Sequence, residues 1–317
     1  MRKKCWHHWL SIIFPGTDMS KKVLVIGGSG FTGRHVLQEM IRRGMDVYAM
    51  QHHTPLPDME GIKIIKGGIG DVNRRLLDSV RPDTVFHLAR PKFPLLRRAG
   101  RNLAARWAAF QNQRLIREME RPGHPARLVF ASGSLMYGSS PHPHDEDAPL
   151  KPISFARQYY RGEIPVLNAI EAGKIPVTVI RFPWLLGKGS WFEWFYLRAM
   201  NQYQAIPLFG DGNNLMEIID IQDAARLALQ VTDDPQTRGI INLVSSGAVT
   251  QLEFVSVLSS VSGLPVKDYR EVFHRSPEKE AIQAFTSGIV LATKYSALTT
   301  GFRYTSLEDS LRRILSE

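Results

Sequence analysis

Three glycines, Gly27, Gly30 and Gly33, separate a short apolar run from a helical pattern. The first suits a tight strand-to-helix turn, the second lets a pyrophosphate approach backbone N–H groups, and the third lets the helix pack closely on the strand. The N–H groups at the start of a helix attract anions, because they lie at the positive end of its dipole. The turn therefore predicts a dinucleotide site that includes Phe31 and Thr32.

Hydroxyl side chains that could exchange a proton with a substrate lie farther along the chain. Ser132, Ser134 and Tyr137 follow a later apolar run, and Tyr159 stands beside Tyr160 in a helical segment. A phenol beside a cation can act as a general acid. The flanking cations are Arg157 and Arg161. Tyrosines on a helix are more often packing residues, so packing is the alternative for both.

Strands and helices must position these groups. Along the chain, patterns typical of strands alternate with patterns typical of helices. The short apolar runs are Val23–Ile26, Val47–Met50, Lys63–Lys66, Thr84–Leu88, Leu128–Ser132, Val177–Arg181 and Ile240–Val244. After the glycine turn, Val36, Leu37 and Met40 repeat at helical spacing, and Gly44 follows where a left-handed helix end is expected. The alternation predicts an α/β fold with a doubly wound parallel Rossmann sheet.

Three parts of the chain are expected. Residues 1–18 start with basic residues, but their apolar run is short, so they are interpreted as a disordered tail or an over-extended start. Residues 19–183 and about 218–247 should form the dinucleotide-binding domain. Residues 184–217 and about 248–317, where aromatic residues and Gly-rich loops interrupt the alternation, should form a smaller C-terminal substrate lobe.

Composition excludes several classes of protein. With 44% apolar and 22% charged residues the chain is globular. Its single cysteine, Cys5, cannot form an internal disulfide or a thiolate metal site, which favours a cytoplasmic protein. No apolar stretch reaches about 18 residues, so no membrane helix is expected. His142 and His144 lie among prolines, as in an exposed loop, and no metal site is expected.

The chain carries a net charge of +10. Part of the excess forms a basic run: Arg97, Arg98, Arg101, Arg106, Arg114, Arg117, Arg121 and Arg127. Such a run is usually a solvated helix face. It could instead guide an anionic substrate, or an RNA backbone by counterion release.

The glycine spacing resembles the extended short-chain dehydrogenase/reductase family, which includes NAD-dependent epimerases and dehydratases. Further matches follow in the family's order: 87–89 (HLA), 132–138 (SGSLMYG), 181–187 (RFPWLLG), 208–212 (LFGDG), 219–225 (IDIQDAA) and 301–307 (GFRYTSL). The resemblance implies an NAD(P) cofactor, a small-molecule substrate and a homodimer. The cofactor contacts that it implies beyond the glycine turn are Gln51, His52, Ile69, Leu88 and Ala89.

The family's proton-transfer pair is altered. Oxidoreductases of the family carry Tyr-x-x-x-Lys on the helix after the fifth strand, where a spacing of four places both side chains on one face. Aligned on Glu163, Phe155 takes the tyrosine position and Tyr159 the lysine position. Alignment on Pro152 offers Ala156 and Tyr160 instead. No register restores the pair, so any proton transfer should use Tyr159 or the hydroxyls of Ser132, Ser134 and Tyr137.

Other family positions differ as well. Gly133 stands where a helper Ser or Thr is usual, and Gly68 where an Asp commonly contacts the adenine. Met216 replaces an arginine that clamps a nucleotide-sugar diphosphate, and Trp184 stands near the place of a family asparagine. A substrate without a nucleotide is therefore expected.

The end of the second strand encodes no clear choice of cofactor. NAD-binding members carry an Asp there, and NADP-binding members an Arg, whereas this chain has Gln51-His52-His53. Arg34 and His52 together would offer cationic donors to a 2′-phosphate, which favours NADP; solvated loop histidines are the alternative.

Two functions follow. The first is an atypical oxidoreductase or isomerase acting on a small substrate. The second is an inactive, cofactor-sensing protein that binds a protein partner or RNA through the basic run. In either case, a dimer is expected between the helix Asn102–Glu120, with its small flank Ala104, Ala105, Ala108 and Ala109, and the helix Phe155–Ala172 of a second subunit.

Overall fold

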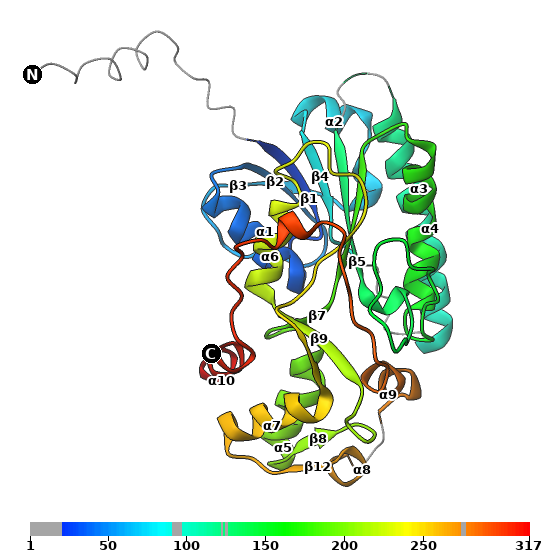
Figure 1. Cartoon of the computed structure of the whole chain (residues 1–317). Helices are drawn as coiled ribbons and strands as arrows, with labels where there is room; N and C mark the ends of the chain where they lie inside the picture. The colour runs from blue at the N-terminus through cyan, green and yellow to red at the C-terminus, as the bar shows by residue number, and fades with distance from the viewer. Residues whose placement is uncertain (1–20, 91–96, 122, 124–125, 274–276) are drawn as a thin grey trace, which may run out of the picture.

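The computed structural model describes residues 21–90, 97–121, 123, 126–273 and 277–317. A sheet of seven parallel strands runs through its upper part (Figure 1), in the order β10-β6-β5-β4-β1-β2-β3. Its strands are β1 Lys22–Ile26, β2 Asp46–Gln51, β3 Ile62–Lys66, β4 Thr84–His87, β5 Arg127–Gly133, β6 Val177–Phe182 and β10 Gly239–Asn242. Each of the seven expected runs is confirmed as one of these strands, and so is the doubly wound parallel fold.

Helices cover both faces of this sheet (Figure 1). Helices α1 (Phe31–Arg42) and α6 (Ile221–Gln230) pack on one face, and α2 (Arg74–Val80), α3 (Arg97–Glu120) and α4 (Arg157–Ala172) on the other. All six residues of β6 are buried, as expected for a strand shielded on both faces. Gly44 follows α1 with a φ of 69°, which confirms the expected left-handed helix end.

A smaller lobe lies below the sheet in Figure 1. It contains β7 Trp184–Leu186, α5 Arg198–Tyr203, β8 Ile206–Leu208, β9 Leu215–Asp220, β11 Ala248–Thr250, α7 Gln251–Ser262, β12 Val266–Asp268, α8 Tyr269–Val272, α9 Lys279–Phe285 and α10 Leu307–Ser316. Aromatic residues form its core: Phe192 and Tyr196 are fully buried, together with Phe209 and Phe254. Burial of large rings contributes strongly to the hydrophobic stabilisation of a small lobe.

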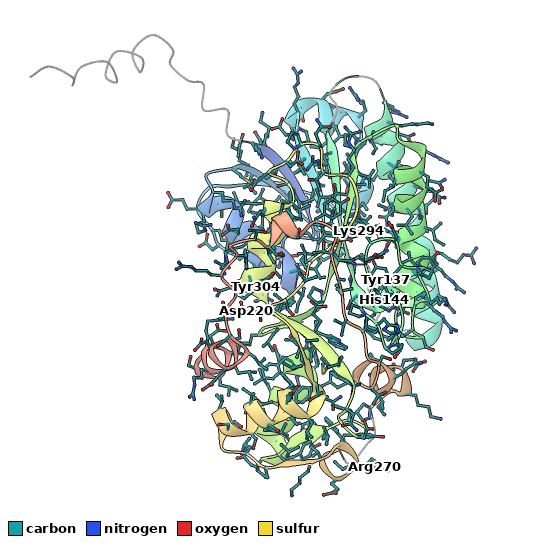
Figure 2. All side chains as sticks on the ribbon, viewed as in Figure 1. Tyr137, His144, Asp220, Arg270, Lys294 and Tyr304 are labelled. Carbon is teal, nitrogen blue, oxygen red and sulfur yellow. The ribbon has the colours of Figure 1, made fainter. Side chains whose placement is uncertain are left out.

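The C-terminal segment returns from the lobe to the sheet, and buried carboxylates hold it there. Glu217 accepts hydrogen bonds from the backbone N–H of Ser245 (2.8 Å) and of Leu291 (2.5 Å). Asp223 accepts one from the N–H of Thr305 at 2.6 Å. Tyr304, labelled in Figure 2, lies on this returning segment, and its hydroxyl donates to the carbonyl of Val244 at 3.0 Å. Residues 289–305 thus include contacts with the dinucleotide-binding part, through Asn242 and Asp223. The expected assignment of residues 248–317 to the smaller lobe stays a prediction.

In the part of the chain that the structure describes, no helix is long and apolar enough to cross a membrane. Within the same ranges, no three His, Cys, Asp or Glu side chains are placed to hold a metal ion. His142 is exposed, as expected, but His144 is only partly exposed, and its ring stacks on Tyr137 with centroids 5.1 Å apart. The tail 1–18, with Cys5, lies outside the described residues.

Candidate functional site

The glycine turn lies at the carboxyl end of β1, in the middle of the sheet. Gly27 has a φ of 91°, and a Cβ at this position would lie 2.5 Å from the backbone N of Ala89. At Gly33 a Cβ would lie 2.1 Å from the carbonyl oxygen of Gly27. Neither position can accept a side chain, because both are in contact with backbone. These two glycines are therefore required by the fold itself.

Gly30 is different. A Cβ there would meet only the carbonyl oxygen of Gly27, at 3.3 Å, and would otherwise project into open space. Gly30 is also the N-cap of α1, it offers no side-chain hydrogen bond, and the first turn of the helix holds no acidic residue. The first N–H groups of α1 thus have no capping side chain. This open, positively polarised turn fits a pyrophosphate.

The other expected cofactor contacts follow neighbouring strands. Gln51 ends β2, Ile69 follows β3, and Leu88 and Ala89 follow β4. Since β4, β1, β2 and β3 are adjacent and parallel, the structure brings these residues to one edge of the sheet. That edge, where the chain order reverses beside β1, is where open α/β sheets bind their ligands.

The two cations expected to favour NADP have different neighbours. His52 lies against Gly68, where a Cβ would be 3.2 Å from the imidazole, and its ring is 3.6 Å from that of His53. Arg34 points toward the loop after β7, with Nη2 3.2 Å from the position of a Cβ on Gly189. The Gln51 side chain accepts the N–H of Leu56 at 3.1 Å. The adenosine end thus has no preformed pair of cations.

Comparison with known proteins agrees with this geometry. Residues 23–243 match the model of the family described as "NAD dependent epimerase/dehydratase family". The chain belongs to this family.

Individual members of the family are distant relatives. YtcB of Bacillus subtilis, named as an uncharacterised UDP-glucose epimerase, is 25% identical over 264 residues, which span 76% of this chain and 82% of YtcB. A bifunctional pinoresinol-lariciresinol reductase of Thuja plicata is 24% identical over 337 residues, spanning 94% of this chain and 100% of the reductase. The structure of MoeE5 in complex with UDP-glucose and NAD superposes with a TM-score of 0.70 at 25% identity, covering 93% of this chain and 97% of that one.

The positions expected for the family's proton-transfer pair lie at the start of α4. Phe155 precedes the helix, Tyr159 lies in its first turn, and their ring centroids are 5.7 Å apart. Both are partly buried in an apolar cluster that also contains Tyr160, Trp184 and residues of the lobe. The ring of Trp184 stacks on Phe285 at 5.3 Å. The site therefore has an aromatic wall, and Tyr159 is its hydroxyl-bearing member closest to Phe155.

Ser132, a second candidate, is engaged in the core. Its hydroxyl donates to the Glu163 carboxylate at 2.5 Å and accepts from the Arg181 guanidinium, and the residue is 2% exposed. Ser134 is also buried, at 3% exposed. Neither hydroxyl is open to a ligand in this structure, which favours structural roles for both.

Tyr137 is likewise enclosed. Its hydroxyl donates to Oδ1 of Asn242 at 2.8 Å, its exposed fraction is 1%, and burial raises the pKa of its phenol. Asn242 in turn donates to the carbonyls of His144 (3.0 Å) and Ala292 (2.8 Å). Figure 2 shows Tyr137 and His144 next to each other beside the sheet. Tyr137 therefore helps to join the loop after β5 to the returning C-terminal segment.

Sequence reasoning missed Arg90. This residue directly follows the 87–89 segment after β4, and its guanidinium carbon lies 5.1 Å from the centroid of the Tyr159 ring. The available signal was an arginine immediately after a family segment that borders the dinucleotide. Nothing in the local pattern related that arginine to a tyrosine 69 positions later, because the contact is tertiary.

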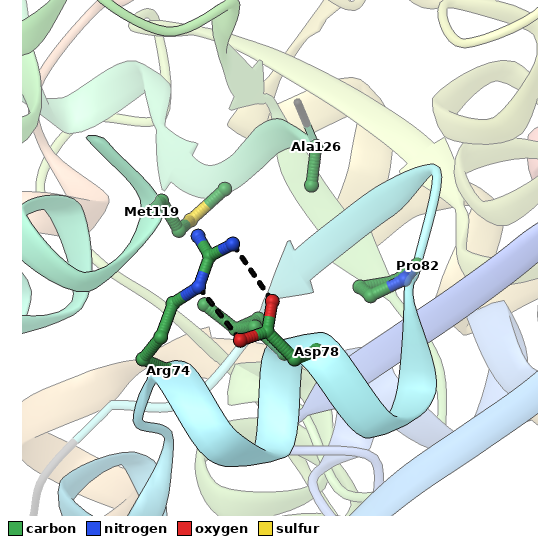
Figure 3. Close-up of a pocket in the computed structure, with 6 residues that line it drawn as sticks. Arg74, Asp78, Pro82, Met119 and Ala126 are labelled. Carbon is green, nitrogen blue, oxygen red and sulfur yellow. Dashed lines mark hydrogen bonds and ion pairs between the residues drawn. The ribbon is translucent and has the colours of Figure 1, made fainter. Parts of the chain in front are cut away.

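The described residues line two hollows that bear on the assignment of the site. A small one, lined by Arg74, Asp78, Met119 and their neighbours (Figure 3), lies at the amino ends of β4 and β5, at the opposite edge of the sheet from the glycine turn. The lining residues Arg74 and Asp78 form an ion pair there, with N and O 2.7 Å apart, which is a structural contact. A larger groove of about 230 Å³ lies along the start of α4, lined by Asn102, Ser154, Phe155, Arg157, Gln158, Arg161 and Glu280.

Only some arginines of the basic run are exposed on the surface. Arg106, Arg114 and Arg117 of α3 are exposed, but Arg127 is 7% exposed and donates to the carbonyl of Asp234 at 2.8 Å. Arg121 pairs with Glu118. The side chains of Arg97, Arg98 and Arg101 lie outside the described residues. The face that an anion could reach is thus smaller than the sequence indicates.

Proposed function

We propose that this member of the epimerase/dehydratase family is an NAD(P)-dependent oxidoreductase or isomerase that acts on a small substrate without a nucleotide. The observation that carries the proposal is the open turn at Gly30, against which the end of β4 packs, together with Tyr159, whose ring lies under Arg90 after β4. A helix start without a capping side chain or an acidic group suits a pyrophosphate, and a phenol nearby suits proton exchange.

A bound dinucleotide would accept or donate a hydride. The chain itself would hold the pyrophosphate with the N–H groups that follow Gly30, keep the backbone of Ala89 against the turn, and deliver a proton from the Tyr159 hydroxyl to the substrate oxygen. Phe155 cannot donate a proton and would shape the pocket. Ser132, Ser134 and Tyr137 are second choices as acids, because all three are buried.

A substrate without a nucleotide is supported by Met216 and Trp184. Met216 is fully buried in β9 and therefore presents no cation to a diphosphate. Trp184 is held by stacking on Phe285. MoeE5 is described with UDP-glucose, whereas the Thuja plicata relative, which aligns over 94% of this chain, is a pinoresinol-lariciresinol reductase.

A preference for NADP stays a prediction. It requires Arg34 to turn from Gly189 toward the ribose, beside His52. A protein that binds NAD and NADP with equal affinity would leave Arg34 at Gly189, as the structure has it.

We also propose a cytoplasmic homodimer, formed through a surface different from the one expected. Ala105 and Ala108 contact Gly162 of the same chain: a Cβ on Gly162 would lie 3.0 Å from that of Ala108. The small-residue flank is therefore used within the subunit. The apolar residues that α3 leaves exposed are Leu103, Trp107 and Phe110, at 49%, 39% and 60%, beside Ile164 of α4 at 38%.

The second candidate function, an inactive cofactor sensor that binds a protein partner or RNA, is favoured by Phe155 in the acid position and by the exposed Arg106, Arg114 and Arg117. A measurement of enzymatic turnover distinguishes the enzyme from the inactive sensor. Purified protein is mixed with NADPH or NADH and a panel of ketones and aldehydes, and oxidation of the cofactor is followed by absorbance. Substrate-dependent oxidation supports the enzyme, whereas dinucleotide binding without any turnover supports the sensor.

A further inference from the structure

Arg90 lies between the dinucleotide turn and the start of α4. Its backbone follows Ala89, whose N would be 2.5 Å from a Cβ on Gly27. Its exposed side chain extends over Tyr159, with the guanidinium carbon 5.1 Å from the ring centroid. One arginine thus connects the end of β4 to the tyrosine proposed as the acid.

Gly133 leaves room beside this guanidinium. A Cβ on Gly133 would lie 3.8 Å from Nη2 of Arg90 and 3.7 Å from the carbonyl oxygen of Phe182, with nothing closer. A serine or threonine side chain would occupy this volume. Because Gly133 has none, an oxygen of a ligand can take the place of that side chain next to the guanidinium.

The charge of Arg90 is uncompensated within the described ranges. No carboxylate in these ranges forms an ion pair with Arg90. Its guanidinium makes a cation–π contact with the ring of Tyr159. Other arginines near the sheet are paired: Arg181 with Glu163, Arg226 with Asp223 and Arg313 with Asp220. A guanidinium offers donors in a planar fork that matches a carboxylate, and such charge-assisted bonds are among the strongest in proteins.

The surroundings of Arg90 are aromatic. Phe155 lies 5.7 Å from Tyr159, and Trp184 belongs to the same cluster. We propose that Arg90 binds a carboxylate of the substrate in the space beside Gly133, and that the substrate is a small carboxylic acid with an apolar or aromatic body. This inference rests on the proposed function, because it places the substrate next to the dinucleotide turn.

The test uses matched pairs of ligands on the full-length protein saturated with NADP⁺ or NAD⁺. Pyruvate, phenylpyruvate and benzoylformate, each beside its methyl ester, are titrated by calorimetry. At least one acid should bind about 10-fold or more tightly than its ester, since one charge-assisted pair is lost in the ester. Arg90→Gln should remove this preference, and Arg90→Lys should keep part of it.

Arg114→Gln is the matched control, because Arg114 lies exposed on α3 and should leave the acid preference unchanged. Unaltered dinucleotide affinity of Arg90→Gln shows that the variant is folded. Three results would overturn the inference: no acid binds, acid and ester bind alike, or Arg90→Gln weakens the dinucleotide and not the acid. The last would make Arg90 a contact of the cofactor phosphate.

Hydride transfer is measured separately, with the same acids and esters and NAD(P)H. An acid that binds through Arg90 but is neither reduced with NAD(P)H nor isomerised in the presence of NAD(P)⁺ would count against the proposed function and leave this inference intact. Conversely, reduction of neutral ketones that Arg90→Gln does not change, together with an absent acid preference, would refute the inference alone.

Discussion

The carboxylate Oε1 of Glu163 lies 2.5 Å from Nη1 of Arg181, and neither side chain is exposed to solvent by more than 1%. The pair joins α4, whose first turn carries Tyr159, to β6. The hydroxyl of Ser132 on β5 completes the cluster. Three elements that border the site are therefore held together by one buried ionic contact.

Removal of one partner should be costly. Glu163→Ala leaves the Arg181 guanidinium buried without its carboxylate, so the free energy of unfolding should fall by about 3–5 kcal/mol. Ser132→Ala removes only a hydroxyl that both groups share and should cost about 1–3 kcal/mol. Urea unfolding followed by tryptophan fluorescence measures both. A Glu163→Ala protein as stable as the parent would show that this pair does not hold the elements together.

The glycine turn makes opposite predictions at two positions. Gly30→Val should fold, because a Cβ there meets only one oxygen at 3.3 Å, but should abolish dinucleotide binding, because the side chain enters the open turn. Gly33→Val should fail to fold, since its Cβ would be 2.1 Å from a backbone oxygen. Circular dichroism measures whether each variant folds, and calorimetry with NAD and NADP measures dinucleotide binding. If Gly30→Val bound NAD or NADP as tightly as the parent protein, the dinucleotide site would not lie at this turn.

The proton-transfer pair can be restored. A phenol keeps a pKa near 10 without a cationic neighbour, so Phe155→Tyr alone should do little. Phe155→Tyr with Tyr159→Lys should gain slow NAD(P)H-dependent reduction of generic carbonyl compounds. In the parent, Tyr159→Phe should remove any native turnover and leave dinucleotide binding intact. Turnover that survives both Tyr159→Phe and Tyr160→Phe would point to Ser132, Ser134 or Tyr137 as the acid.

Glu217 should make the stability depend on pH. Burial raises the pKa of its carboxyl from about 4.5 to about 7. Between these values the folded protein holds a proton that the unfolded chain releases, so the stability contributed by this group falls as the pH rises from about 4.5 to about 7. Relative to Glu217→Gln, which does not titrate, the free energy of unfolding should fall by about 3 kcal/mol over this range. A difference between the two proteins that does not change with pH would contradict the shift.

The exposed aromatic residues of α3 should hold the dimer. Trp107→Asp and Phe110→Asp place charges in the proposed contact and should convert the protein to a monomer at micromolar concentration. Trp194→Asp is the control, because Trp194 is 54% exposed but lies in the lobe. Light scattering reports the mass. A parent that is monomeric, or a dimer that both α3 variants retain, would refute this surface.

The sequence alone determined the parallel sheet, the glycine turn and the absence of a Tyr-x-x-x-Lys motif from residues 152–163. These depend on local patterns: β-branched runs fix the strands, spaced glycines fix the turn, and the type of residue at position 155 decides whether a proton is available. For this reason all seven strands were predicted within a few residues, whereas the cofactor contacts proposed after β2, β3 and β4 stay predictions.

Only the tertiary structure decided which candidates face a ligand. Ser132 and Tyr137 have the right chemistry for a site, but packing encloses both, because Glu163, Arg181 and Asn242 reach them from other elements. Arg90 carries no local signal, and it became a candidate only when the fold placed it over Tyr159 and beside Gly133. Contacts between distant segments depend on how the elements pack, and no spacing along the chain encodes them.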